Sequence, residues 1–237
     1  MGIVRMGPPT ELITKIASEF KVQNFVETGT YYGNTAFWAS QEFPRVFTIE
    51  YSRELYEKVI QEYSYAKNIE FIFGDSRVVL DELVSSLEGS TLFWLDAHWS
   101  GGSTYGNTDQ CPLVEELKVI NNSQFENFIL IDDARLFTSP PQPPHKVEQW
   151  PDIVTVINTL LSAKHNRYVV IIEDVIISAP TFAKQVVVQH CQAVNAKAWE
   201  EYGRQIKTSD FKKGMSLIFQ DLRRKVKSSV KRLKSSF

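Results

Sequence analysis

Acidic side chains lie at or near the carboxyl end of five consecutive apolar runs of this 237-residue sequence. A single acid in such a position can cap the helix that follows. Several acid-bearing ends around one crevice instead suggest a ligand with hydroxyl groups, an amine or a metal ion. The runs are NFVETG, VFTIE, IEFIFGD, TLFWLDAH and NFILIDDA, and their acids are Glu27, Glu50, Asp75, Asp96, Asp132 and Asp133.

The turn after the first run, FVETGTYYGNT (25–35), has two glycines four residues apart. A dinucleotide site needs G-x-G-x-x-G to hold a pyrophosphate, and here the middle glycine is absent. Glu27, at the mouth of the turn, would repel a phosphate and suit an ammonium group. Glu50 follows the second run, where an acid can accept both hydroxyls of a ribose. An adenosine that carries an amino acid and no phosphate, S-adenosylmethionine, meets these demands. An ordinary tight turn is the alternative.

The segments between the runs have the spacing of amphipathic helices. In 53–66, for example, Leu55, Val59 and Tyr63 share one helical face. Alternation of strands and helices predicts right-handed β-α-β units. We therefore predict an α/β fold, a Rossmann-like doubly wound, mostly parallel seven-stranded sheet with helices on both faces. The sixth apolar run is 167–179, and the other predicted helices cover 10–20, 76–88, 112–121 and 151–165.

The motif E-T-G-T-Y-Y-G-N-T resembles the E-x-G-x-Y-x-G-x-[ST] turn of the catechol and caffeoyl-CoA O-methyltransferases, which are class I S-adenosylmethionine-dependent enzymes. The resemblance continues in order through FTIEYS, FIFGDSR, WLDAHW and ILIDDARL, over about residues 20–137. DAHWSGG is also similar to the macrocin-type sugar O-methyltransferases.

The resemblance implies which residues contact the cofactor. Asp75 could instead cap a helix, and Trp99 could instead belong to the core. The implied contacts are Glu27, Thr28, Gly29, Thr30, Tyr31, Gly33 and Thr35 in the turn, Glu50, Tyr51, Gly74, Asp75 and Ser76 after the next two runs, and Asp96, His98 and Trp99 after the fourth.

Asp96, Asp132 and Asp133 end two neighbouring runs. Carboxylates that face one another are costly unless they are protonated or neutralised by a cation, and Mg²⁺ with its oxygen ligands would neutralise them. The resemblance implies these three acids as ligands of a Mg²⁺ ion, although the family often has Asn where Asp133 stands. The alternative is that they cap helices or bind Arg135 without a metal.

The reaction implied by the resemblance is methyl transfer to a hydroxyl of a sugar, glycan or small natural product. His98 is the candidate catalytic base, because imidazole titrates near neutral pH. The catechol-type enzymes have a lysine where Trp99 stands. Loops 100–111 and 138–145 are candidates for binding the acceptor. A metal-independent methyltransferase of the same fold is one alternative, and a non-catalytic cofactor-binding or nucleic-acid-binding protein is the other.

Composition indicates a cytoplasmic protein. Hydrophobic residues make up 43% and charged residues 23% of the sequence, as in ordinary globular domains. No apolar run approaches the ~20 residues of a membrane span, and the N-terminus lacks the apolar core of an export signal. Cys111 and Cys191 have no C-x-x-C spacing, which predicts reduced thiols.

The charge is unevenly distributed along the chain. Residues 221–237 hold seven of the 26 Lys and Arg and one of the 28 Asp and Glu, which leaves 19 basic and 27 acidic residues elsewhere. We predict a methyltransferase domain over 1–220 and a basic amphipathic tail over 221–237, able to lie on a membrane surface. A solvated terminal helix is the alternative, and no motif strongly indicates nucleic-acid binding. The apolar positions of the tail are Leu222, Val226, Val230, Leu233 and Phe237.

Overall fold

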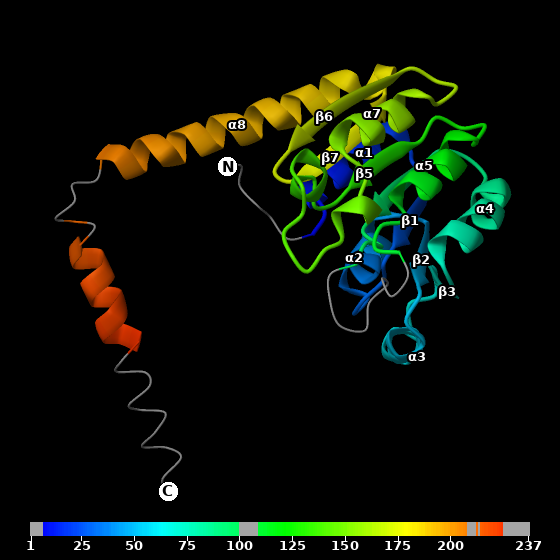
Figure 1. Cartoon of the computed structure of the whole chain (residues 1–237), viewed down its shortest axis with the longest axis horizontal. Coiled ribbons are helices and arrows are strands. Elements are labelled where there is room, and N and C mark those ends of the chain that lie inside the picture. Colours follow the sequence, from blue (N-terminus) through cyan, green and yellow to red (C-terminus); the bar gives the residue numbers. More distant parts are fainter. Residues whose placement is uncertain (1–6, 100–108, 208–211, 213, 225–237) are drawn as a thin grey trace, which may run out of the picture. The chain divides into compact units, whose positions relative to one another are not determined.

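The computed structural model describes residues 7–99, 109–207, 212 and 214–224 (Figure 1). The chain divides into two compact units, Met1–Val188 and Gln189–Phe237. The first unit is built on a seven-stranded sheet of order β3-β2-β1-β4-β5-β7-β6. Its strands are β1 (Asn24–Thr28), β2 (Arg45–Glu50), β3 (Ile69–Phe73), β4 (Thr91–Leu95), β5 (Phe128–Ile131), β6 (Arg167–Ile172) and β7 (Val175–Pro180).

The continuous apolar runs form the centre of this sheet because both of its faces are covered. Every residue of β1, β4 and β5 is buried, whereas the edge strand β3 is only partly buried. The first five strands pair in parallel, so their carboxyl ends meet at one edge. Strand order reverses between β1 and β4, and a ligand crevice is expected at such a switch point.

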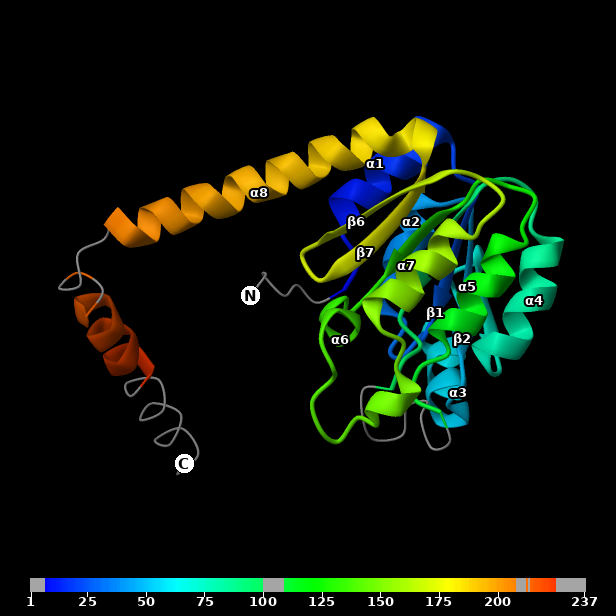
Figure 2. The same cartoon turned by 45° about the horizontal axis from the view of Figure 1, so that its top comes forward.

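Helices connect the strands and cover the sheet on both sides (Figure 2). On one face α4 packs against α5, and α5 packs against α7. Side-chain oxygens of Ser52, Asp75 and Asp152 accept backbone N–H bonds at the first turns of α3, α4 and α7. The helices are α1 (Thr10–Phe20), α2 (Asn34–Glu42), α3 (Arg53–Glu62), α4 (Ser76–Ser86), α5 (Leu113–Asn121), α6 (Arg135–Thr138), α7 (Ile153–Leu161) and α8 (Lys184–Lys207).

The run 167–179 is not one strand, as its apolar character suggested, but the hairpin of β6 and β7. The two strands are joined at Glu173 and Asp174, which both have positive φ angles, 47° and 72°. Positive φ at both central residues is the geometry of tight two-residue hairpin turns. The hairpin supplies the seventh strand, and β7 pairs antiparallel with both β5 and β6.

The second unit contains most of α8 and a helix over 214–224. Only 221–224 of the predicted tail, 221–237, are among the described residues. No helix in the described part of the chain is long and apolar enough to cross a membrane.

Candidate functional site

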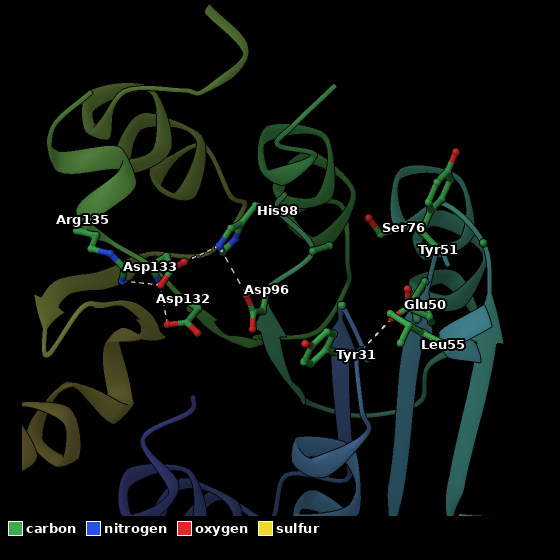
Figure 3. A pocket seen from close by; sticks show the side chains of 14 residues that line it. Tyr31, Glu50, Tyr51, Leu55, Ser76, Asp96, His98, Asp132, Asp133 and Arg135 are labelled. Atoms are coloured by element: carbon green, nitrogen blue, oxygen red, sulfur yellow. Dashed lines mark hydrogen bonds and ion pairs between the residues drawn. The ribbon is translucent and has the colours of Figure 1, made fainter. Parts of the chain in front are cut away.

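A cavity of about 380 Å³ lies at the carboxyl ends of the parallel strands (Figure 3). It holds the predicted residues that follow β1, β2, β3, β4 and β5, so the sheet brings together side chains that are up to a hundred positions apart in the chain. The predicted residues that line it are Gly29, Tyr31, Glu50, Tyr51, Gly74, Ser76, Asp96, His98, Asp132 and Asp133.

Gly29 is required by the protein's own backbone. Its φ is +89°, and a Cβ atom added to it would lie 2.3 Å from the carbonyl oxygen of Asp96. The end of β1 and the end of β4 therefore approach more closely than any side chain would allow. Gly33 also has positive φ, and an added Cβ would lie 2.7 Å from the ring of Tyr63. Both glycines are thus required by packing, and Gly29 also lines the cavity.

Glu50 is held from two sides at the end of β2. One carboxylate oxygen accepts the N–H of Tyr31 at 2.9 Å, and the other accepts the N–H of Ser52 at 2.7 Å. Burial raises the pKa of Glu50, while these backbone donors oppose the increase. A carboxylate has about four acceptor positions, so two fixed backbone bonds leave capacity for hydroxyl donors of a ligand.

Several predicted cofactor residues do not line the cavity. Trp99 contacts the ring of His145 at a centroid distance of 5.2 Å, and it is only partly buried. Asp75 caps α4, which was the alternative to a cofactor contact. It also forms an ion pair of 2.7 Å with Arg77. The predicted residues outside the lining are Glu27, Thr28, Thr30, Gly33, Thr35, Asp75 and Trp99.

Glu27 lies beneath the glycine turn rather than at its mouth. It accepts a 2.6 Å hydrogen bond from the hydroxyl of Thr48, whose oxygen is also 2.6 Å from that of Thr30. Burial raises the pKa of Glu27 to about 8, and the hydrogen bond from Thr48 only partly offsets this effect. Glu27 is therefore protonated at neutral pH and belongs to a buried hydroxyl network.

Three acids from β4 and β5 face a histidine across the cavity, as Figure 3 shows. Asp133, with φ of 55°, directs one oxygen to Nε2 of His98 at 2.8 Å and the other to Nη1 of Arg135 at 2.6 Å. Asp132 accepts the N–H of Asp133 at 2.8 Å, and Asp96 Oδ1 lies 3.7 Å from His98 Nε2.

The acids differ in their ionisation. Burial raises the pKa of Asp96 to about 6 and that of Asp132 to about 7. Burial acts in the same direction on Asp133, but His98 and Arg135 outweigh it and hold the pKa of Asp133 below its usual value. Burial alone would lower the pKa of His98, and its hydrogen bond with Asp133 and the charges of Asp96 and Asp133 raise it instead.

This arrangement does not fit a three-carboxylate magnesium site. Both oxygens of Asp133 are engaged by His98 and Arg135, and Arg135 also bonds to Asp174 at the hairpin turn. Within the described ranges, no group of three His, Cys, Asp or Glu side chains is arranged to hold a metal ion. A guanidinium, which is a fixed positive charge, takes the place of a cation beside Asp133.

Four residues of the lining were not predicted from the sequence: Ile49, Leu55, Ala97 and Arg135. Arg135 was considered only as an alternative partner of the three acids, and at the start of α6 it does pair with Asp133. Ile49, Leu55 and Ala97 are apolar, and nothing in their types distinguishes them from the core.

In the described part of the chain, the end of the first predicted acceptor loop contacts residues that follow the second loop. Gln110 Oε1 accepts the N–H of Lys146 at 2.7 Å and the indole N–H of Trp150 at 3.0 Å. The ring of Trp150 lies 5.6 Å from that of His98 and 5.0 Å from that of His145. Residues 100–108 of the first loop lie outside the described residues.

Comparisons with known proteins identify solved structures of similar fold. No family model and no curated protein matches the sequence. Among solved structures, the chain is similar to SAH-bound methyltransferase PaMTH1 of Podospora anserina, with 18% identity over 74% of this chain and 80% of that one and a TM-score of 0.50. A putative caffeoyl-CoA O-methyltransferase of Staphylococcus aureus has 13% identity over 75% and 86% of the two chains and a TM-score of 0.51.

The chain thus shares the Rossmann-like fold of these two solved structures, as the alternation of its strands and helices predicted. The predicted sheet of seven mostly parallel strands with helices on both faces is confirmed.

Proposed function

We propose that this protein is an S-adenosylmethionine-dependent methyltransferase that acts on a hydroxyl of a neutral sugar, glycan or small natural product. The observation that carries the proposal is the position of Glu50. It ends β2 inside the cavity, with both oxygens fixed by backbone N–H groups. The two similar solved structures, one bound to SAH and one titled a putative caffeoyl-CoA O-methyltransferase, support the choice of cofactor and of reaction.

The charge of the cavity supports the same cofactor. Glu50, Asp96, Asp132 and Asp133 line it, and the one cation among its lining residues, Arg135, is engaged by Asp133 and Asp174. An acid-rich cavity favours a ligand with net positive charge, such as the sulfonium cofactor, and disfavours ligands with net negative charge, such as phosphates. The same charge is the reason to choose a neutral polyhydroxy acceptor.

The transfer itself is an in-line displacement. A lone pair of the acceptor oxygen attacks the methyl carbon while the carbon–sulfur bond breaks and its electron pair passes to sulfur, so the sulfonium becomes a thioether. The protein must align oxygen, carbon and sulfur and accept the proton of the hydroxyl.

His98 is the proposed acceptor of that proton. When its Nε2–H donates to Asp133, the lone pair is on Nδ1, and Asp133 stabilises the imidazolium that forms. Arg135 holds Asp133 from the other side. Magnesium assistance, which the resemblance implied, is given no step here because the guanidinium of Arg135 already balances the charge of Asp133.

Isothermal titration calorimetry with SAH tests the proposal. We expect micromolar binding that Glu50→Ala weakens at least about tenfold, since two hydroxyl contacts of a buried carboxylate are lost. Glu82→Ala, an exposed acid on α4, is the control and should leave the affinity unchanged. Binding that survives Glu50→Ala, or no binding to the unaltered protein, would overturn the assignment and favour a non-catalytic role.

The metal is tested separately. Methyl transfer from labelled cofactor to a panel of sugars and catechols is compared after EDTA treatment and after readdition of Mg²⁺. We expect equal rates, and a loss that Mg²⁺ restores would favour the metal-assisted form of the reaction.

A further inference from the structure

The helix over 214–224, orange-red in Figure 1, carries a row of exposed apolar side chains. Met215, Ile218, Phe219 and Leu222 are 38%, 55%, 57% and 51% exposed. Their spacing of i, i+3, i+4 and i+7 places them on one face of a helix. We call these four residues the apolar stripe.

Polar and charged side chains, among them the acid Asp221, occupy most of the rest of this helix. Ser216, Gln220, Arg223 and Arg224 are all exposed and fall outside the apolar stripe at about 100° per residue. Leu217 is also exposed and lies outside the stripe, about 100° from Ile218 and about 140° from Leu222. The helix is therefore amphipathic, with arginine at its carboxyl end.

The sequence after this helix adds positive charge. Residues 225–237 contain five Lys and Arg and no acid, in a chain whose first 220 residues have eight more acidic than basic residues. The apolar positions predicted for the tail begin at Leu222, so the stripe extends that pattern upstream by two turns. Residues 225–237 lie outside the described residues.

We propose that the helix over 214–224 binds an anionic lipid surface. Its apolar stripe enters the boundary between headgroups and acyl chains, and Arg223 and Arg224 contact the headgroup phosphates. A helix with a narrow apolar face, a basic polar face and low overall hydrophobicity lies in the plane of such an interface.

The chemistry of the stripe favours a membrane over the other possible partners. A nucleic acid would attract the basic residues, but it offers no apolar phase for Ile218, Phe219 and Leu222. A second copy of the helix could cover the apolar stripes, but it would bring two basic segments together without compensating acids.

Cosedimentation of the full chain with vesicles tests the proposal. One set of vesicles is pure phosphatidylcholine, and the other contains about one third phosphatidylserine. We expect binding to the anionic vesicles at least about tenfold tighter than to the neutral ones, and weakening as salt increases. Replacement of both arginines, Arg223→Glu with Arg224→Glu, should reduce binding to the anionic vesicles by at least about tenfold.

Ile218 and Leu217 provide a matched pair, because they are isomers of similar exposure on different faces of the helix. Ile218→Ser should weaken binding to anionic vesicles at least about fivefold, and Leu217→Ser should change it less than about twofold. Equal effects of the two substitutions would overturn the proposal, as would the absence of binding to anionic vesicles.

Two further outcomes would each replace the lipid surface by another partner. Binding to polynucleotide that is tighter than binding to vesicles and insensitive to Ile218→Ser would identify a nucleic-acid surface. A dimer in sedimentation velocity that Ile218→Ser dissociates, together with no vesicle binding, would identify a second copy as the partner. None of these measurements depends on methyl transfer.

Discussion

His98 lies between two carboxylates that differ in ionisation. Asp133 is ionised because His98 and Arg135 stabilise its charge, whereas burial raises the pKa of Asp96 to about 6. The histidine is thus oriented by one fixed anion, and Arg135 connects that anion to Asp174 in the turn between β6 and β7. Asp133 and Arg135 are close together in the sequence. The contacts of this group with His98 and with Asp174 of the hairpin could not be read from the sequence.

The first prediction concerns the charge of Asp133. Asp133→Asn keeps the size of the side chain and removes its charge, so the pKa of His98 should fall. Two-dimensional NMR of the imidazole protons against pH measures the change, with the His98 signal assigned from a His98→Asn variant. Asp152→Asn, at the exposed first turn of α7, is the control and should leave the His98 titration in place. An unchanged pKa in Asp133→Asn would show that the contact does not govern the histidine.

The second prediction concerns Glu27 and pH. Its pKa is about 8 in the folded protein and near 4.5 when unfolded, so the folded state holds the proton more tightly. Folding stability from this residue is therefore complete below about pH 4.5 and falls as pH rises to about 8, beyond which it is constant. Glu27→Gln, which keeps an oxygen for Thr48, should be more stable than the unaltered protein by roughly 2 kcal/mol at high pH.

Urea unfolding at pH 5 and at pH 8.5 measures this difference. The gain from Glu27→Gln should be much smaller at the lower pH, and Glu82→Gln on the surface of α4 should show no such pH dependence. A gain of the same size at both values would mean that Glu27 is not the group that titrates.

At the scale of elements, the order of strands and helices could be predicted because each carries its own periodicity. The parallel strands β1 to β5 are apolar runs with polar ends, and α3 and α4 have clear amphipathic spacing and capping residues. The hairpin of β6 and β7 was missed because a charged pair, Glu173 and Asp174, was the only break in a run of β-formers. A two-residue turn needs no glycine or proline when other side chains tolerate positive φ.

The sequence predicted the site residues less completely than the order of the strands and helices. The residues that follow strands could be placed at one edge because parallel topology requires it. The direction of each side chain could not be predicted. Glu27 and Glu50 both occupy strand ends, but only Glu50 lines the cavity. Orientation at a strand end depends on the path of the next loop and on its hydrogen bonds, which have no period in the sequence.

The third prediction concerns the contact of β1 with β4. Gly29→Ala should destabilise the protein by about 3 kcal/mol or more, because the added methyl overlaps the carbonyl group of Asp96 and φ is positive. Gly203→Ala, in α8 with open space around the added atom, should instead be neutral or stabilising by up to about 1 kcal/mol. Thermal and urea unfolding compare the two, and similar effects at both positions would contradict the packing argument.

At the scale of the whole molecule, the cavity and the apolar stripe belong to different units. Every residue that lines the cavity comes before Val188, and the stripe lies within Gln189–Phe237. We therefore propose that the two parts work independently, one in cofactor binding and the other in attachment.

The fourth prediction follows from that division. A chain ending at Lys207 should bind SAH with an affinity within about twofold of the full chain, because it keeps all the lining residues. The same chain should lose its attachment to anionic vesicles. Calorimetry and cosedimentation on one preparation measure both, and a tenfold loss of SAH affinity would show that the second unit supports the cofactor site.

The acid-rich cavity also has a consequence for turnover. When the sulfonium gives up its methyl group, the ligand loses a positive charge while the carboxylates around it keep theirs. The spent ligand is then held less strongly than the fresh one, by a difference that grows as the salt concentration falls. Under the proposed function, the acids of the cavity that are ionised both attract the donor and favour the release of its by-product.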